Sequence, residues 1–167
     1  MRSSLILTLS GADKPGLVDS LAQVVRDAGG NWEESRMSRL AGQFAGVVHV
    51  TVPAEKLDAL ASAVRNVPGL TVALHSAGGE HPTGDTYELE LVGADHEGIV
   101  SRVSRVLASG GVSIEELWTG REEAPHAGGM LFRARATLRA PSRGQMDELR
   151  DRLEKLADEF MVEIWID

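Results

Sequence analysis

Apolar and polar positions follow an order along this chain that occurs twice. In the first half, Leu5, Leu7 and Leu9 alternate with polar or smaller residues, which predicts a strand. Between about Pro15 and Ala28, apolar residues recur at steps of three and four, which predicts a helix with one apolar face. The same reasoning predicts strands at residues 31–40, 43–52 and 70–75 and a helix around residues 57–64.

The second half repeats this pattern at an offset of 82 residues. Gly11–Asp13 falls on Gly93–Asp95, and Gly16 falls on Gly98. We expect a four-residue insertion within GREEAPHAGG, after which the pattern of the later strands matches again. The match preserves helix period, strand period and glycine positions, which indicates a duplication. The repeated strands are predicted at residues 87–91, 112–121, 130–138 and 161–166, and the helices at 97–109 and around 146–157.

Each half therefore has the order βαββαβ, which is typical of the ferredoxin-like unit. The predicted fold class is α+β, with two tandem units whose antiparallel sheets carry helices on one face. We expect the first domain at residues 1–76, a linker rich in Gly and Pro at 77–85, and the second domain at 86–167. The outward sheet positions 45, 47, 49 and 51 are weakly polar, whereas 131, 133, 135 and 137 include two arginines.

Composition and charge narrow the classes of function. The chain has 167 residues, of which 17 are basic and 25 acidic, giving a net charge of −8. This balance argues against direct nucleic-acid binding, which needs clustered Lys and Arg. The absence of Cys excludes disulfides, Cys-ligated zinc and thiol catalysis. No apolar run is long enough for a signal peptide or a membrane span, so a cytoplasmic location without membrane binding is expected.

The repeated phrase carries the candidate chemistry. GADKPG follows a predicted strand and opens a predicted helix, with Pro15 as the expected first helical residue. Free amides at a helix N-terminus favour a carboxylate, and Asp13 beside them could accept a hydrogen bond from an ammonium group. The sequence also leaves open that Asp13 and Asp95 only cap their helices.

Over residues 9–37, LSGADKPGLVDSLAQVVRDAGGNWEESRM resembles the opening of an ACT domain, a small-molecule regulatory module of amino-acid metabolism. Two such domains without an attached enzyme are similar to the glycine cleavage system transcriptional repressor group. The resemblance implies binding of an amino acid, plausibly glycine, where the turn meets a neighbouring domain, with no cofactor. The implied sites are Asp13, Lys14, Pro15, Gly16 and Leu17 with Asn31, and Asp95, His96, Glu97, Gly98 and Ile99 with Ser113.

The second copy departs from the first at two positions of the turn. His96 replaces Lys14, and Glu97 replaces Pro15. Glu97 suits the positive end of the helix, but it competes with an anionic ligand for the same amides. We therefore expect the first turn to be the better carboxylate receptor, while the second has either lost binding or prefers an amine or a partner's basic residue.

Other patterns give no catalytic or metal site. His75, Glu80 and His81 fit no zinc motif, and a solvated linker explains them better. No nucleophile elbow, phosphate-binding loop or dinucleotide motif is present. The paired acids at 33–34 and 115–116 are expected to point to opposite sheet faces and so to form no catalytic dyad.

The sequence thus predicts a non-enzymatic protein that senses an amino acid. By resemblance, it would modulate transcription of glycine cleavage genes through a transcription activator. The alternative is a regulatory subunit that binds and controls an enzyme of amino-acid metabolism. Formation of a homodimer is left open by the sequence.

Overall fold

The computed structural model describes residues 1–79, 83–124 and 129–167. The chain divides into two compact units, Met1–Glu80 and His81–Asp167. Within the described ranges, no helix is both long and apolar enough to cross a membrane.

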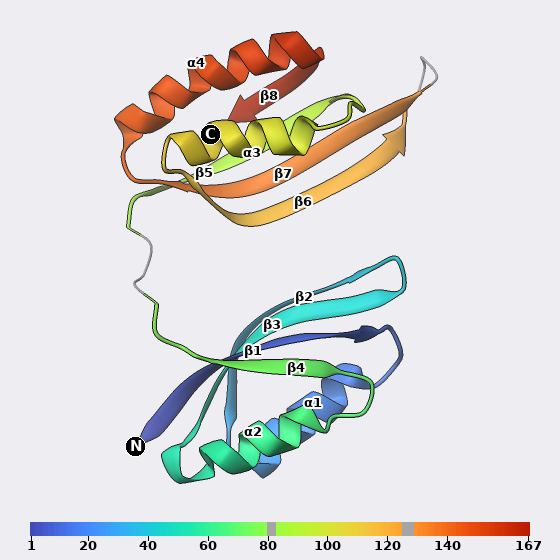
Figure 1. Ribbon diagram of the computed structural model, residues 1–167, viewed down its shortest axis with the longest axis vertical. Coiled ribbons are helices and arrows are strands. Elements are labelled where there is room, and N and C mark those ends of the chain that lie inside the picture. The colour runs from blue at the N-terminus through green and yellow to red at the C-terminus, as the bar shows by residue number, and fades with distance from the viewer. Residues whose placement is uncertain (80–82, 125–128) are drawn as a thin grey trace. The chain divides into compact units, whose positions relative to one another are not determined.

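The first unit is a four-stranded antiparallel sheet with its helices on one face (Figure 1). The strand order is β2-β3-β1-β4, so β1 lies inside the sheet and β2 forms one edge. Its elements are β1 (Arg2–Ala12), α1 (Leu17–Asp27), β2 (Asn31–Leu40), β3 (Gln43–Pro53), a 3-10 turn (Ala54–Lys56), α2 (Leu57–Arg65) and β4 (Thr71–Ser76).

The second unit repeats this arrangement, with the strand order β6-β7-β5-β8. Each unit has the order βαββαβ, so the predicted ferredoxin-like fold and the α+β class are confirmed. The elements are β5 (Asp85–Ala94), α3 (Ile99–Ser109), β6 (Ser113–Glu123), β7 (Met130–Ala140), α4 (Arg143–Phe160) and β8 (Val162–Ile166).

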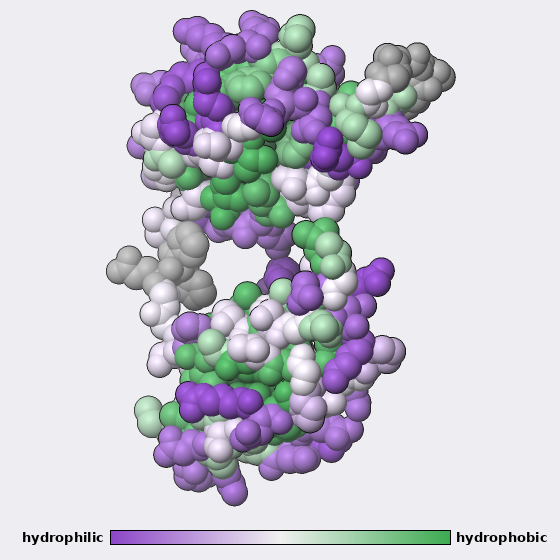
Figure 2. All heavy atoms as spheres, turned by 45° about the vertical axis from the view of Figure 1, so that its right-hand side comes forward, coloured by the Kyte–Doolittle hydropathy of each residue, from purple (hydrophilic) through white to green (hydrophobic). Residues whose placement is uncertain are grey.

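Each unit has its own aliphatic core between its sheet and its helices. Leu7 and Leu21 are fully buried in the first core, and Leu138 and Met146 in the second. Full burial of such a side chain contributes roughly 1.5–3 kcal/mol. In Figure 2, hydrophilic residues cover much of the surface of each unit, and apolar patches are visible among these hydrophilic residues.

The first helix of each unit begins later than predicted. Pro15 is not the first helical residue, because α1 begins at Leu17 after Gly16. Gly16 has a φ of +89° and Gly98 a φ of +80°, so both lie in the left-handed region and cannot continue a right-handed helix. The prediction that the second copy's helix starts at Glu97 is wrong for the same reason, since α3 begins at Ile99.

The insertion between the two copies is six residues, not the predicted four. Leu7 of β1 pairs with Val48, whereas its repeat Leu89 pairs with Ala136, so the partner moves by 88 positions while the strand moves by 82. Four of the six residues lengthen the connection between β6 and β7 beyond the two-residue turn 41–42, and the other two form the additional pair Glu123–Met130 at the end of the ladder. The true match of Phe44 is therefore Phe132 rather than Met130.

A β-bulge occurs at the same place in both units and overturns the prediction for the paired acids. Trp32 pairs with Val50 and Glu34 with His49, which leaves Glu33 as the extra residue. Glu33 accepts a hydrogen bond from Thr51 on the outer face, where Glu34 also lies opposite His49. The two carboxylates thus share the outer face, because the bulge interrupts the alternation of side chains.

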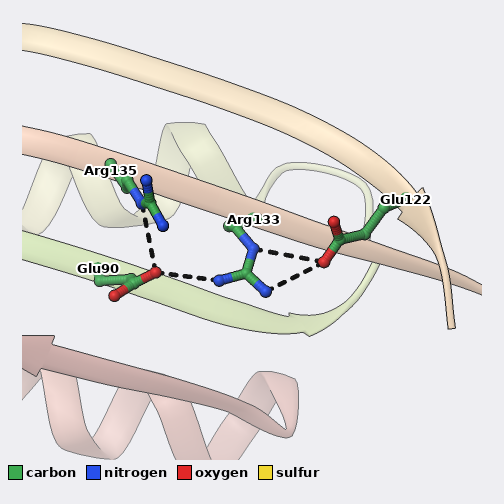
Figure 3. Close-up of polar contacts among 4 residues, drawn as sticks. All are labelled: Glu90, Glu122, Arg133 and Arg135. Atoms are coloured by element: carbon green, nitrogen blue, oxygen red, sulfur yellow. Dashed lines mark hydrogen bonds and ion pairs between the residues drawn. The ribbon is translucent and has the colours of Figure 1, made fainter. Parts of the chain in front are cut away.

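The outer face of the second sheet carries a network of ion pairs, shown in Figure 3. Arg133 lies 3.0 Å from Glu90 and 3.1 Å from Glu122, and Arg135 lies 3.4 Å from Glu90. Hydrogen bonding to Glu122, and then to Glu90, raises the pKa of Arg133. This face is more strongly charged than its counterpart in the first unit, as the sequence predicts.

Candidate functional site

The two strand-to-helix turns place an aspartate between an arginine and the neighbouring hairpin. The backbone N–H of Asp13 donates to the carbonyl of Gly42 at 2.9 Å, and Arg39 Nη1 lies 3.4 Å from Asp13 Oδ2. In the second unit, the Asp95 N–H donates to Met130 at 3.1 Å, and Arg121 Nε lies 2.7 Å from Asp95 Oδ2. The turns are therefore built alike.

Neither aspartate caps its helix. The residues at the N-caps are Gly16 and Gly98, and no side chain accepts a hydrogen bond from the first turn of α1 or α3. The alternative that Asp13 and Asp95 only cap the helices is therefore wrong. Their carboxylates instead contact arginines, and the N-terminal turn of each helix is left without a side-chain cap.

Two glycines of the repeated phrase are required by packing rather than by a ligand. A β-carbon on Gly11 would lie 2.0 Å from the carbonyl oxygen of Gly69, in the loop before β4. A β-carbon on Gly93 would lie 2.4 Å from Cγ1 of Val162 at the start of β8. The space beside Gly11 is thus filled by the loop before β4, and the space beside Gly93 is filled by the start of β8.

The other repeated glycines leave open space at the turn. No atom lies within 4 Å of a β-carbon built on Gly16 or Gly98, so the backbone there is accessible. In the first unit the ammonium group of Lys14 lies beside Gly69: a β-carbon built on Gly69 would be 2.6 Å from Lys14 Nζ. Lys14 and Arg39 together give this turn two cations near the N-terminus of α1, and both cations and that terminus favour an anion.

The second turn differs in its two replaced residues. The His96 ring packs edge-on against Phe160, with ring centres 5.9 Å apart, and its Nε2 atom is buried. Glu97 is exposed in front of α3. The second turn therefore presents one arginine where the first presents an arginine and a lysine.

Four of the residues implied by the resemblance do not present side chains at the turns. Leu17 and Ile99 are 3% exposed and belong to the two cores, so their side chains do not face a ligand at the turn. Asn31 pairs with Thr51 and Ser113 with Arg139, at the ends of the sheets opposite to the turns. Along the strands this is a separation of roughly 25 Å, so neither unit alone brings these two groups together.

Arg39 and Arg121 were missed by the sequence reasoning, although a signal was present. They stand 82 residues apart, which is the same offset that relates Asp13 to Asp95. Their side chains reach the turns because the edge strands β2 and β6 run in the same direction as β1 and β5, with one strand between, and end at the same edge of the sheet as the turns. Among the described residues, no group of three His, Asp or Glu side chains could hold a metal ion.

The fold and the family agree with comparisons against known proteins. Residues 3–75 match the model of an ACT domain. A protein of unknown function from Galdieria sulphuraria is 33% identical, with 100% of this chain and 98% of that chain covered and a TM-score of 0.92. A proposed glycine cleavage system transcriptional repressor is 16% identical, with coverage of 100% and 97% and a TM-score of 0.70. No curated protein matches by sequence.

The family model covers the first unit, and the second unit repeats its fold and its turn. The two full-length structural matches contain both units in the same chain. The chain therefore belongs to the ACT-domain family, as a protein of two tandem ferredoxin-like ACT domains that resembles the glycine cleavage system transcriptional repressor group.

Proposed function

We propose that this ACT-domain regulatory protein senses an α-amino acid and acts through a protein partner, without catalysing a reaction itself. Glycine is the first ligand to test, and transcription of glycine cleavage genes is the proposed output. The full-length likeness to a proposed glycine cleavage repressor supports this choice. The alternative output is control of an enzyme of amino-acid metabolism.

One observation carries the proposal: each domain holds an aspartate and an arginine together at an uncapped helix N-terminus. An amino acid at neutral pH presents a carboxylate and an ammonium group a few ångströms apart. Arg39, Lys14 and the amides of α1 suit the carboxylate, and Asp13 suits the ammonium group. Gly16 leaves room for the ligand to approach the backbone.

Calorimetric titration of the full chain with glycine and a panel of other amino acids tests the sensor. Saturable glycine binding is expected, and Arg39→Gln is expected to weaken it at least tenfold. Arg26→Gln is the matched control, because Arg26 is an exposed arginine of α1 that pairs with Asp27 away from the turn. Absence of binding by every amino acid at millimolar concentration would refute the proposal.

Recovery of the protein with its partner separates the two outputs. A DNA-bound transcription activator that co-purifies with the chain, and dissociates on addition of glycine or binds more tightly, would support the regulatory role in transcription. Co-purification of a metabolic enzyme whose activity changes with the chain would support the alternative.

A further inference from the structure

The outer face of the second sheet carries two exposed tryptophans. Trp118 of the edge strand β6 and Trp165 of the edge strand β8 are 56% and 48% exposed. The residues that pair across the four strands at this level form the row Trp118–Arg135–Glu90–Trp165. The row has an aromatic residue at each end and opposite charges in the middle. Tryptophan and arginine are the residues that contribute most often to the free energy of protein interfaces.

The corresponding row of the first unit is different. At the same register its residues are Arg36, Val47, Thr8 and Ala73, and none of these four is aromatic. The same topology therefore forms without tryptophans at these positions. Because the fold does not require them, their presence in the second unit indicates that this face binds another molecule.

The two ends of the row differ in shape. The indole of Trp118 lies over β6, since a β-carbon on Gly120 would be 2.8 Å from its Cη2 atom. At the other end, a shallow hollow is lined by Glu90, Val92, Arg133, Trp165 and Asp167. One end therefore presents an indole on the surface of the sheet, and the other a recess with an aromatic wall.

Charge is also divided between the two central strands. Arg133 and Arg135 of β7 both pair with Glu90 of β5 (Figure 3). Glu88, also on β5, accepts a hydrogen bond from Thr137 of β7 at 2.9 Å. On this face, one central strand is thus positive and its neighbour is negative.

This pattern is complementary to itself. A rotation by 180° about an axis parallel to the strands, midway between β5 and β7, exchanges these two strands and also exchanges β6 with β8. In a second copy placed by this rotation, Glu90 faces Arg135 of the first, and the hollow beside Trp165 faces Trp118. Sheets packed face to face lie about 10 Å apart, a gap that an arginine and a glutamate side chain span together. An interface with two-fold symmetry requires such self-complementarity.

We propose that two copies of the chain associate through the outer faces of their second units, related by this two-fold axis. Each Trp118 enters the hollow beside the other copy's Trp165, and each Arg135 pairs with the other copy's Glu90. Four strands about 4.8 Å apart and roughly ten residues long form a face of roughly 600 Å². Two such faces would bury roughly 1,200 Å², which is at the lower end for specific interfaces, so a weak, reversible dimer is expected. The inference goes beyond the proposed function and does not depend on it.

Sedimentation equilibrium of the full chain, from low micromolar to millimolar concentration, tests the association. A dimer whose population rises with concentration is expected, and Trp118→Ser is expected to weaken it at least tenfold. Leu40→Ser is the matched control, because Leu40 is 79% exposed but lies at the end of β2 in the first unit. A monomer over the whole range would overturn the proposal, as would a dimer that both variants weaken equally or that neither weakens.

Charge reversal on the central strands gives a second test that leaves the tryptophans in place. In a dimer of Arg135→Glu, glutamates would face glutamates, and in a dimer of Glu90→Arg, arginines would face arginines. Each variant alone is therefore expected to associate at least tenfold more weakly than the parent protein. In a mixture of the two variants, every contact between copies joins an arginine to a glutamate, so association is expected to return. Each chain in the mixture still lacks its own internal pair, so the recovery can only come from contacts between copies. A mixture that associates no better than either variant alone would overturn the proposal.

The neighbouring row provides a test by strengthening. Glu116 and Asp167 stand at its two ends, so the same rotation brings these like charges together at the rim of the interface. Glu116→Lys converts this repulsion into attraction and is expected to tighten the dimer severalfold at low salt, with a smaller gain at high salt. Association that is unchanged or weaker in a folded Glu116→Lys variant would overturn the proposed axis.

Discussion

Arg121 holds Asp95 more closely than Arg39 holds Asp13, with nitrogen–oxygen distances of 2.7 Å and 3.4 Å in the two equivalent pairs. All four side chains are partly exposed, and pairs of this kind contribute only about 0.2–1 kcal/mol. The looser pair of the first unit leaves its arginine freer to exchange the aspartate for a ligand carboxylate.

A double-mutant cycle should detect this difference. Arg121→Gln and Asp95→Asn, singly and together, are expected to give a coupling near the upper end of about 0.2–1 kcal/mol in urea unfolding. The same cycle on Arg39 and Asp13 is expected to give less, because the atoms are farther apart. A larger coupling energy between Arg39 and Asp13 than between Arg121 and Asp95 would contradict the inference that the first pair is the weaker one.

Gly11→Ala should destabilise the first unit. Its β-carbon would meet the carbonyl oxygen of Gly69, and backbone on both sides would have to move. We expect a loss of roughly 1–3 kcal/mol in the free energy of unfolding, typical of overpacking. Gly78→Ala serves as the control, since nothing lies within 4 Å of a β-carbon there. A Gly11→Ala variant as stable as the control would show that the loop before β4 yields easily.

The pair Glu115–Arg139 should make stability depend on pH. Hydrogen bonding from Arg139 lowers the pKa of Glu115 in the folded protein. The carboxylate therefore contributes stability above the pKa of the unfolded chain, and this contribution is lost as pH falls through the folded value. The difference in unfolding free energy between the protein and Glu115→Gln should shrink as pH falls from roughly 5 to 3.

Glu33 offers an informative comparison for the same measurement. Hydrogen bonds from Thr51 and Asn31, which are neutral donors, are the largest causes that lower the pKa of Glu33. Added salt should therefore reduce the effect of Glu115→Gln more than that of Glu33→Gln, because salt screens interactions between exposed charges. An equal response to salt would mean that the charge of Arg139 contributes little.

Trp32→Ile should make the first unit resemble the second. Removing the indole from above the core is expected to cost roughly 2–4 kcal/mol, because part of its buried surface is lost and a hollow is left. Urea unfolding of the full chain measures this loss. A variant as stable as the parent protein would show that the indole of Trp32 contributes little to the packing of the first core.

The fold could be predicted from the sequence because its signals are local and occur twice. Alternation in β1 and the three-to-four spacing in α1 are each ambiguous alone, but their repetition in β5 and α3 in the same order leaves one topology. Gly29 and Gly111 likewise mark the helix ends, each with a φ of +69°. The true insertion length could not be counted, because apolar residues at every second position match equally well after a shift of two.

The site was less predictable, because it depends on which groups meet across strands. Arg39 is far from Asp13 in sequence, and only the parallel course of β1 and β2 places them together. Gly11 and Gly16 look alike in the sequence. In the structure, however, Gly69 fills the space where a β-carbon of Gly11 would lie, whereas the space beside Gly16 is open.

The bulges also decide where the chain can lose a residue. In a regular strand, a single deletion moves every following side chain to the opposite face, so the apolar row of β2 would turn to solvent. Deleting Glu33 instead removes the extra residue: Trp32 keeps its partner Val50, and Glu34 keeps its partner His49 in an uninterrupted ladder. Glu115 has the same freedom in β6. Each edge strand thus contains one position at which a change in length, rather than in residue type, leaves the two faces of its sheet intact.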